Sequence, residues 1–264
     1  MEILLNRRGL IKVSGNHAEN FLHSQFTNDI KNIQEKNVQI NAYCQHQGKI
    51  IAILWVLKID GNYYLSILNE LKDLIISKLN MFKLMSQVEI EDCSDTIYQY
   101  GLINENDKNS YKINNNLSLK ISKEHLTDYC DNSLWEAACI DERLPEVYLN
   151  ISEKHIPQAL NLDIDQIGVS FTKGCYPGQE VVARMHYLGK PKRRLFNFTS
   201  KFEVFIGDNL IVNDSKSLKS SGQVIRVTKK NAEYSFLGVF EVSYINHQIF
   251  LNNNQTKLVH LIHE

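Results

Sequence analysis

The chain has 264 residues, with 29 Lys and Arg against 30 Asp and Glu, so its formal net charge is −1. This length suits one large or two ordinary domains, and 43% hydrophobic with 22% charged residues is typical of a packed globular protein. The composition excludes a mostly disordered or collagen-like chain, and the near-neutral charge provides no overall field that would attract nucleic acid or a membrane surface.

The N-terminus and the cysteines predict a cytoplasmic protein. The first apolar run, Ile3–Leu5, is three residues long, whereas a membrane-spanning helix needs about 20. Five cysteines are present, Cys44, Cys93, Cys130, Cys139 and Cys175. They form no C-x-x-C pair, and their odd number and wide separation match no disulfide framework and no zinc site. We therefore expect reduced thiols, no resident metal and no membrane contact.

The first part of the chain predicts strands followed by a helix. Residues 10–13 form a short apolar run, and apolar residues at helical spacing follow over 18–26. Residues 49–57 predict a long strand that an Asp-Gly turn connects to a second strand over 63–67. Apolar residues on one side of 71–82 then predict a helix.

The pattern repeats loosely and then changes. Strands are expected over 96–103 and 111–121, and a helix over 132–143. After Pro191 only short strands and turns follow, which is typical of a small antiparallel barrel or sandwich. The prediction is an α+β protein with two related lobes, about 1–90 and 91–190, and a C-terminal antiparallel β-barrel over 191–264.

The most informative stretch is residues 173–184, K-G-C-Y-P-G-Q-E-V-V-A-R. A strand over 167–171 is expected to lead through a tight turn into a helix that starts at Pro177 and ends near Leu188. Cys175 would then lie just before a helix N-terminus, where free N–H groups and the helix dipole favour a thiolate. Because Lys173 adds a positive charge, we expect Cys175 to be the most reactive of the five thiols.

The surrounding groups have simpler interpretations. The other four cysteines are expected to be buried as small apolar residues. Glu180 and Arg184 are four residues apart on the helix, and the simplest interpretation is a surface pair. His186 lies about three helical turns beyond Cys175 and is too distant to act as its base. His155 is a nearer candidate, and its position is not determined by the sequence.

Several segments together resemble the YgfZ family, folate-binding relatives of the glycine-cleavage T protein. These are 13–15, 21–22, 27–29, 47–49, 156–162 and 168–180. The resemblance continues to Arg193 and into the small β domain, so it covers nearly the whole chain. It implies α+β lobes and a β-barrel arranged as a ring, with tetrahydrofolate in a central channel. It also implies a part in the assembly or repair of iron-sulfur enzymes, including those that thiolate tRNA, and a requirement for the motif cysteine.

The resemblance assigns the site residue by residue. Cys175 and Lys173 are the expected catalytic pair, and the other motif or folate-binding positions are Gly174, Tyr176, Gly178, Gln179, Glu180 and Arg184. The expected partners are folate and, transiently, iron-sulfur client enzymes. The basic cluster 190–194 is more typical of a solvated segment than of an RNA site, so no stable direct binding of nucleic acid is expected.

One departure from the T protein bears on the reaction. T proteins carry an acidic pair after a glycine turn, whereas this chain has Gly48-Lys49-Ile50-Ile51-Ala52 at the corresponding strand. Without a carboxylate to move a proton, aminomethyl transfer from glycine cleavage is not expected. Two alternatives to the accessory role stay open: a folate-dependent one-carbon transferase with Cys175 as nucleophile, and a binding module whose cysteine senses redox state.

Overall fold

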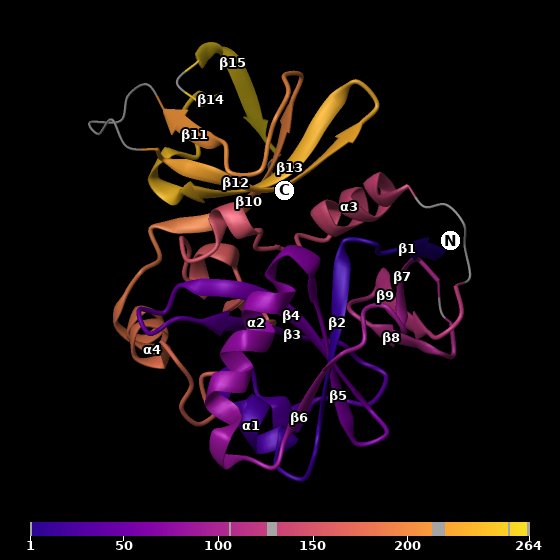
Figure 1. Ribbon diagram of the computed structural model, residues 1–264. Coiled ribbons are helices and arrows are strands. Elements are labelled where there is room, and N and C mark those ends of the chain that lie inside the picture. Colours follow the sequence, from indigo (N-terminus) through magenta and orange to yellow (C-terminus); the bar gives the residue numbers. More distant parts are fainter. Residues whose placement is uncertain (1, 106, 126–130, 213–219, 253, 263–264) are drawn as a thin grey trace.

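The computed structural model describes residues 2–105, 107–125, 131–212, 220–252 and 254–262 (Figure 1). A five-stranded antiparallel sheet forms the larger lobe, in the order β3-β4-β5-β2-β6. Its strands are β2 (Arg8–Ser14), β3 (Gln39–Cys44), β4 (Ile50–Ile59), β5 (Asn62–Leu68) and β6 (Glu89–Asp92). The predicted turn between β4 and β5 is confirmed, since Asp60 and Gly61 both have positive φ, 49° and 77°, as a type I′ turn requires.

Strand β4 is buried on both faces. Leu54 and Val56 pack against α1 (Ala18–Gln25) and α2 (Asn69–Phe82), while Trp55 faces the core that continues toward the rest of the molecule. Neighbouring side chains of a strand point to opposite faces, so β4 separates two hydrophobic cores. This explains why its sequence is an unbroken apolar run without alternation.

A second sheet has the order β1-β7-β9-β8. It contains β1 (Glu2–Leu4), β7 (Tyr98–Ile103), β8 (Ser110–Lys112) and β9 (Leu117–Ser122), and α3 (Asn132–Asp141) packs beside it. The single strand predicted over 111–121 is wrong. Asn114 accepts a hydrogen bond from the backbone N–H of Leu117 (2.8 Å) and turns the chain between β8 and β9, as short polar side chains commonly do.

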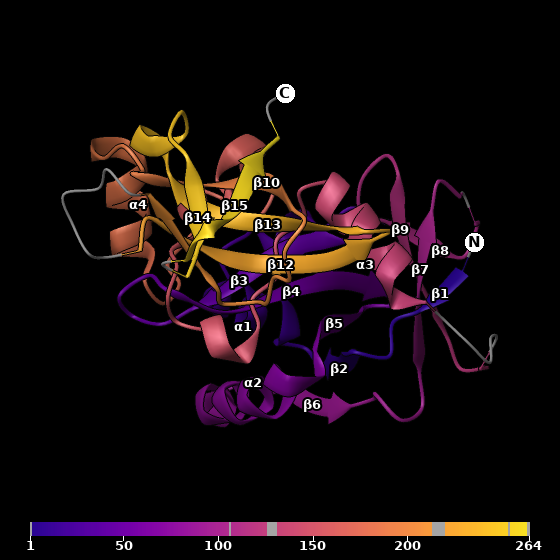
Figure 2. The ribbon, with the colours of Figure 1, turned by 90° about the horizontal axis from the view of Figure 1, so that it is seen from above.

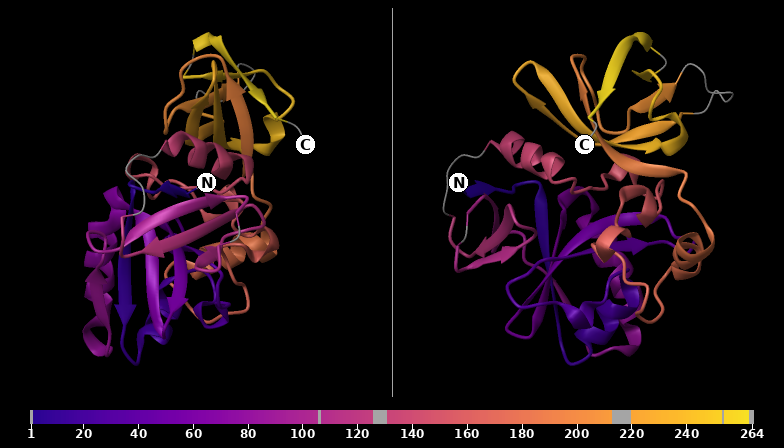
Figure 3. Two further views of the ribbon diagram at one scale, coloured as in Figure 1. Left: turned by 90° about the vertical axis from the view of Figure 1, so that its right-hand side faces the viewer. Right: turned by 180° about the vertical axis from the view of Figure 1, so that it is seen from behind.

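The C-terminal strands close into a barrel, as predicted, in the order β10-β13-β12-β11-β14-β15. They are β10 (Arg193–Ser200), β11 (Asn209–Val212), β12 (Gly222–Lys230), β13 (Glu233–Glu241), β14 (Ile249–Leu251) and β15 (Asn254–Leu261). Phe198, Phe236 and Phe240 fill its interior. Figures 2 and 3 show the barrel lying over α3 and one end of the larger sheet.

Irregular chain connects the lobes to the barrel. It includes the 3₁₀ turns η3 (Leu149–Ile151), η4 (Pro157–Leu160) and η5 (Ile164–Gln166), and then α4 (Gln179–Leu188). Three further 3₁₀ turns lie elsewhere, η1 (Ile30–Asn32), η2 (Lys83–Met85) and η6 (Val242–Tyr244).

Buried ion pairs fill the junction of the two sheets, α3 and the barrel. Arg226 of β12 binds Glu136 of α3, and Arg8 of β2 binds Glu146 while lying 3.8 Å from the ring centre of Trp55. The hollow left beside these side chains has a volume of about 10 Å³, about the room of one water molecule. The side chains at this junction therefore leave room for no more than about one water molecule.

Candidate functional site around Cys175

Helix α4 begins later than predicted. Its first residue is Gln179, and Gly178 precedes it with a left-handed φ of 81°, so the predicted start at Pro177 is wrong by two residues. A left-handed residue cannot continue a right-handed helix backwards. Cys175 is therefore separated from the helix by Tyr176, Pro177 and Gly178. The predicted end is confirmed, with Leu188 the last helical residue.

Gly178 fixes the position of this turn. A Cβ atom on Gly178 would lie 2.5 Å from the carbonyl oxygen of Gln45 and 2.7 Å from Cα of Gly48. These atoms belong to the turn between β3 and β4, where Gly48 also has a positive φ of 75°. Both the backbone angle and the close approach require glycine at position 178, so the motif turn is held directly against the larger sheet.

Lys173 holds the other end of the turn. Its side chain is buried, and its ammonium group donates hydrogen bonds to the carbonyl oxygens of His23 and Phe26 at the C-terminal end of α1. The ammonium nitrogen also lies 5.0 Å from the ring centre of Tyr176. Burial lowers the pKa of Lys173 to about 8, and the charge of Asp29 opposes that shift. Lys173 therefore hydrogen-bonds to a helix end instead of to the thiol.

The segment before the motif is not a strand, contrary to the prediction for 167–171. It follows η5 as irregular chain and pairs with the loop after α1. The hydroxyl of Thr27 donates to the carbonyl oxygen of Gly168 (2.6 Å), and the N–H of Ser170 donates to the carbonyl oxygen of Thr27 (3.0 Å). The amide of Asn28 donates to the carbonyl oxygen of Ile167 (3.1 Å). The loop after α1 therefore satisfies the backbone hydrogen-bonding groups of this segment, which does not pair with a strand.

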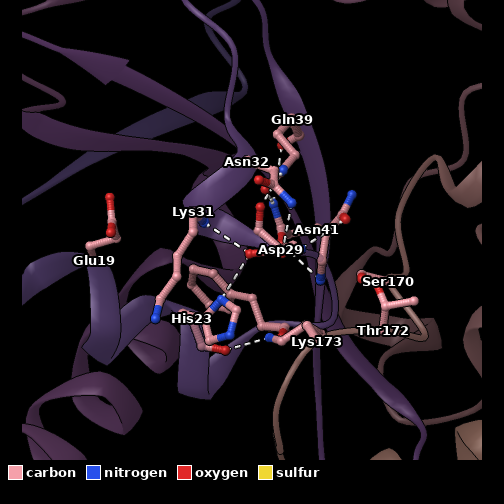
Figure 4. A network of polar contacts seen from close by, with 12 residues as sticks. Glu19, His23, Asp29, Lys31, Asn32, Gln39, Asn41, Ser170, Thr172 and Lys173 are labelled. Atoms are coloured by element: carbon pink, nitrogen blue, oxygen red, sulfur yellow. Dashed lines mark hydrogen bonds and ion pairs between the residues drawn. The ribbon is translucent and has the colours of Figure 1, made fainter.

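His23 and Asp29 lie beside the motif turn. The sequence analysis did not single out His23, and it included Asp29 in the resemblance segment 27–29 without assigning it a role at the site. In Figure 4 they lie next to Lys173, with His23 Nδ1 3.1 Å from Asp29 Oδ1. His23 Nε2 is 3.9 Å from the position that a Cβ atom on Gly174 would occupy. Burial, followed by the charge of Lys173, lowers the pKa of His23. The sequence around these residues does not indicate that they lie beside the motif, because the fold alone brings α1 and the following loop to it.

Cys175 is exposed, whereas Cys44, Cys93 and Cys139 are buried. Burial raises the pKa of these three thiols, that of Cys139 to about 12. The expectation of buried, unreactive thiols is confirmed for them, and Cys130 lies outside the described residues. Cys175 is thus the accessible thiol among the four cysteines that the structure describes.

The remaining motif residues have different surroundings. Tyr176 is buried, and burial raises its pKa. Gln179 is half-buried, whereas Gly174, Glu180 and Arg184 are exposed. Glu180 and Arg184 make no ion pair in the described part of the chain, so the expected surface pair is not formed.

The histidines weighed from the sequence are engaged elsewhere. His155 is hydrogen-bonded through Nε2 to Gln223 of the barrel (3.0 Å), and burial lowers its pKa to about 4. His186 stacks on Phe171, with ring centres 3.6 Å apart. In the basic cluster, Arg194 binds Asp163 of the connecting chain.

A hollow of about 580 Å³ lies between α3 and the turn joining β12 to β13. Asp131, Asp141, Lys229 and Lys230 supply its charged groups. Cys175 does not line it, and α3 and α4 lie on opposite sides of the molecule (Figures 1 and 2).

Over the described ranges, no three metal-ligating side chains come together, and no helix is long and apolar enough to cross a membrane.

The fold defines the class of protein. The chain superposes on the crystal structure of the glycine cleavage system aminomethyltransferase T from Bartonella henselae with a TM-score of 0.73 and 11% sequence identity, covering 100% of this chain and 84% of that one. The architecture of lobes and barrel is therefore that of the T-protein fold, as predicted.

Sequence comparisons define the family. No protein-family model matches the chain. A Haemophilus influenzae protein described as uncharacterized is 30% identical over 234 residues, covering 84% of this chain and 82% of that protein. The tRNA-modifying protein YgfZ of Colwellia psychrerythraea is 30% identical over 244 residues, covering 79% and 75% of the two chains, and that of Vibrio vulnificus strain CMCP6 is 27% identical over 246 residues, covering 78% and 75%. The chain belongs to the YgfZ family.

Proposed function

We propose that this protein is an accessory factor for iron-sulfur enzymes that acts through the Cys175 thiol and affects tRNA modification indirectly, through those enzymes. The observation that carries the proposal is the exposure of Cys175 on a turn that is fixed at both ends. Lys173 ties the turn to α1 and Gly178 ties it to the β3–β4 turn. A thiol held in this way is presented to a partner while its backbone stays in place.

The chemistry of a single thiol limits what it can do alone. A thiolate is a nucleophile and a ligand for iron, but iron-sulfur clusters usually take four protein ligands. Among the described residues, no three His, Cys, Asp or Glu side chains come together in a way that could hold a metal ion. We therefore propose that Cys175 handles sulfur or iron transiently, while a client enzyme supplies the other ligands.

Tetrahydrofolate is the proposed ligand, and its fit can be tested against the hollows of the molecule. The junction between the sheets, α3 and the barrel has room for about one water and does not fit a pterin. The hollow beside α3, at about 580 Å³, is within the usual range for small-molecule sites, about 300–1,000 Å³. The carboxylates of Asp131 and Asp141 could accept hydrogen bonds from the N–H groups of a pterin. Lys229 and Lys230 could form ion pairs with the carboxylates of the glutamate tail.

This location separates the ligand from the thiol. Tetrahydrofolate, when bound, supplies a reduced pterin that carries one-carbon units. Asp141, Lys229 and Lys230 would hold it in the hollow beside α3, which Cys175 does not line. The alternative of aminomethyl-type transfer has no support at β4, where Ile50, Ile51 and Ala52 are buried and carry no carboxylate.

The test of the thiol role is a complementation experiment. Cells that lack their own YgfZ protein receive the wild type, Cys175→Ser or Cys93→Ala, and the thiolation of tRNA by an iron-sulfur enzyme is measured. We expect Cys175→Ser to reduce thiolation to the level of the empty vector, because Ser offers no thiolate. Cys93→Ala should retain thiolation, since Cys93 is buried and distant from the motif in sequence. Full activity of Cys175→Ser would overturn the proposal.

A further inference from the structure

We propose that α4, with the chain on either side of it, forms a binding surface for a single strand of nucleic acid whose bases are unpaired. The inference goes beyond the proposed function and does not depend on it. The surface, called the α4 surface below, combines aromatic rings with exposed cations. Its rings are those of Phe171, His186 and Tyr187, and its cations are Arg184, Lys190 and Lys192.

The aromatic rings form one cluster. Phe171 and His186 stack with their ring centres 3.6 Å apart and an angle of 13° between the ring planes. The ring of Tyr187 lies edge-on to both, 4.8 Å from that of His186 and 6.3 Å from that of Phe171. Tyr187 is 66% exposed. Because unpaired bases stack on exposed aromatic side chains, this cluster offers them a platform.

The outward side of α4 places a cation beside the rings. Val182 is buried, whereas Arg184, Tyr187 and Leu188 are exposed. Residues three and four apart lie on the same side of a helix, so Arg184 is a neighbour of both Tyr187 and Leu188. Leu188 is 83% exposed and adds apolar area next to the rings. A guanidinium in this place can bind a phosphate through two parallel hydrogen bonds.

Lys190 and Lys192 continue the positive charge beyond the end of α4. Both are exposed. The N–H of Val242 donates to the carbonyl oxygen of Lys192 (2.9 Å), which holds this chain against η6. Among the residues that the structure describes, no carboxylate forms an ion pair with Arg184, Lys190 or Lys192. Their charges are therefore available to phosphates, which dominate the affinity of proteins for nucleic acids.

The positive charge of the α4 surface is local. Residues 181–194 contain five Lys and Arg residues and no Asp or Glu, in a chain whose net charge is −1. Two carboxylates lie nearby. Asp163 is paired with Arg194, which is not part of the surface. Glu180 is exposed in the first turn of α4, and it leaves an excess of positive charge on this side of the helix.

The composition of the α4 surface favours a nucleic acid over a protein partner. Lys is depleted at protein–protein interfaces, whereas basic side chains next to exposed rings are typical of surfaces that bind single strands. The sequence analysis interpreted 190–194 as a solvated segment. The structure adds the ring of Phe171, from the segment before the motif, to the rings on α4. Because the surface is exposed and small, we expect weak, salt-sensitive binding and no stable complex.

The test is fluorescence anisotropy of the full chain with a labelled single-stranded RNA of about 12 nucleotides. We expect saturable binding at about 50 mM NaCl that weakens as salt is added. Tyr187→Ala should weaken binding at least fivefold, because a base loses its stacking partner. Replacing both Lys190 and Lys192 by Gln should reduce the slope of log affinity against log salt by about 1.4, since each phosphate contact on a single strand contributes about 0.7.

Matched controls come from other parts of the chain. Phe205→Ala removes a ring of similar exposure, 58%, from the barrel region. Replacing both Lys108 and Lys123 by Gln removes the same charge from exposed positions next to β8 and β9, which lie on the other side of the molecule from α4 (Figures 1 and 2). Both controls should leave the affinity and the salt slope unchanged. Circular dichroism and thermal unfolding establish that each variant is folded.

Several results would overturn the inference. They are no binding by the wild type, an unchanged affinity in Tyr187→Ala, and duplex RNA bound as tightly as the single strand, because a duplex hides the faces of its bases. Displacement of the RNA by a polyglutamate peptide of equal charge also overturns it, since an acidic protein would then fit equally well. Binding of single-stranded DNA of the same sequence with similar affinity supports the inference, because the surface contacts bases and phosphates. None of these measurements involves Cys175, so their failure leaves the proposed function intact.

Discussion

Individual residues of the motif divide into those that shape the turn and those that face outward. Lys173, Tyr176 and Gly178 are engaged with α1, the protein interior and the β3–β4 turn, respectively. Cys175 and Gly174 are exposed. Most motif residues with buried contacts therefore hold the turn that carries Cys175 in place. The two motif glycines differ, because the packing requires glycine at position 178 but not at position 174.

The two motif glycines give a matched pair of stability predictions. Gly178→Ala should destabilise the protein by about 2–4 kcal/mol, because Ala resists a left-handed φ and its Cβ would collide with Gln45 and Gly48. Gly174→Ala should cost less than about 1 kcal/mol, since it has no neighbour closer than 3.9 Å and no left-handed φ. Urea unfolding measures both, and equal losses for the two variants would contradict the packing described for Gly178.

At the scale of elements, the irregular chain between α3 and α4 connects the larger sheet to the barrel, which share no strand pairing. His155 is an example: its backbone carbonyl accepts from Ile50 of β4 (2.8 Å), and its imidazole bonds to Gln223 of β12. Asn161 similarly exchanges hydrogen bonds with the backbone of Leu195 in β10. Because His155 is buried, its protonation at low pH is unfavourable in the folded protein and should weaken this connection.

The pH dependence of stability follows from His155. Its pKa is about 4 in the folded protein and about 6.5 when unfolded, so between these values the unfolded chain binds more protons. Stability from this site is therefore complete above pH 6.5 and is lost as the pH falls toward 4, by about 1 kcal/mol per pH unit. His155→Gln, which has no proton to bind, should show a shallower loss in urea unfolding between pH 6.5 and 4.5. An identical slope would contradict this account.

At the scale of the whole molecule, the hollow beside α3 is separate from the motif turn, since Cys175 does not line it. The core formed by Trp55, Trp135 and Leu237 runs without interruption from the larger sheet through α3 into the barrel. Arg226 and Glu136 close the junction from within. The barrel therefore shares its hydrophobic core with the larger sheet and α3.

The proposed folate site leads to a calorimetric prediction. Titration of the full chain with tetrahydrofolate should give saturable binding, and replacing both Lys229 and Lys230 by Gln should weaken it about tenfold, because the tail carboxylates lose their partners. Replacing Lys190 and Lys192 by Gln removes the same charge from an exposed segment near α4 and should leave the affinity unchanged. Absence of binding in the wild type contradicts the ligand, and equal effects of the two double variants contradict the location.

The sequence by itself determined the features that depend on neighbouring residues. Apolar spacing predicted α1, α2 and β4, the Asp60-Gly61 turn predicted a hairpin, and short strands after Pro191 predicted the barrel. The motif singled out Cys175 because a turn next to a helix can be recognised from its own residues. Only the tertiary structure decided that Lys173 binds the end of α1, that His23 and Asp29 lie beside the motif, and that the junction is filled. Those contacts join residues far apart in the chain, and their geometry depends on the packing of whole elements, which no local pattern specifies.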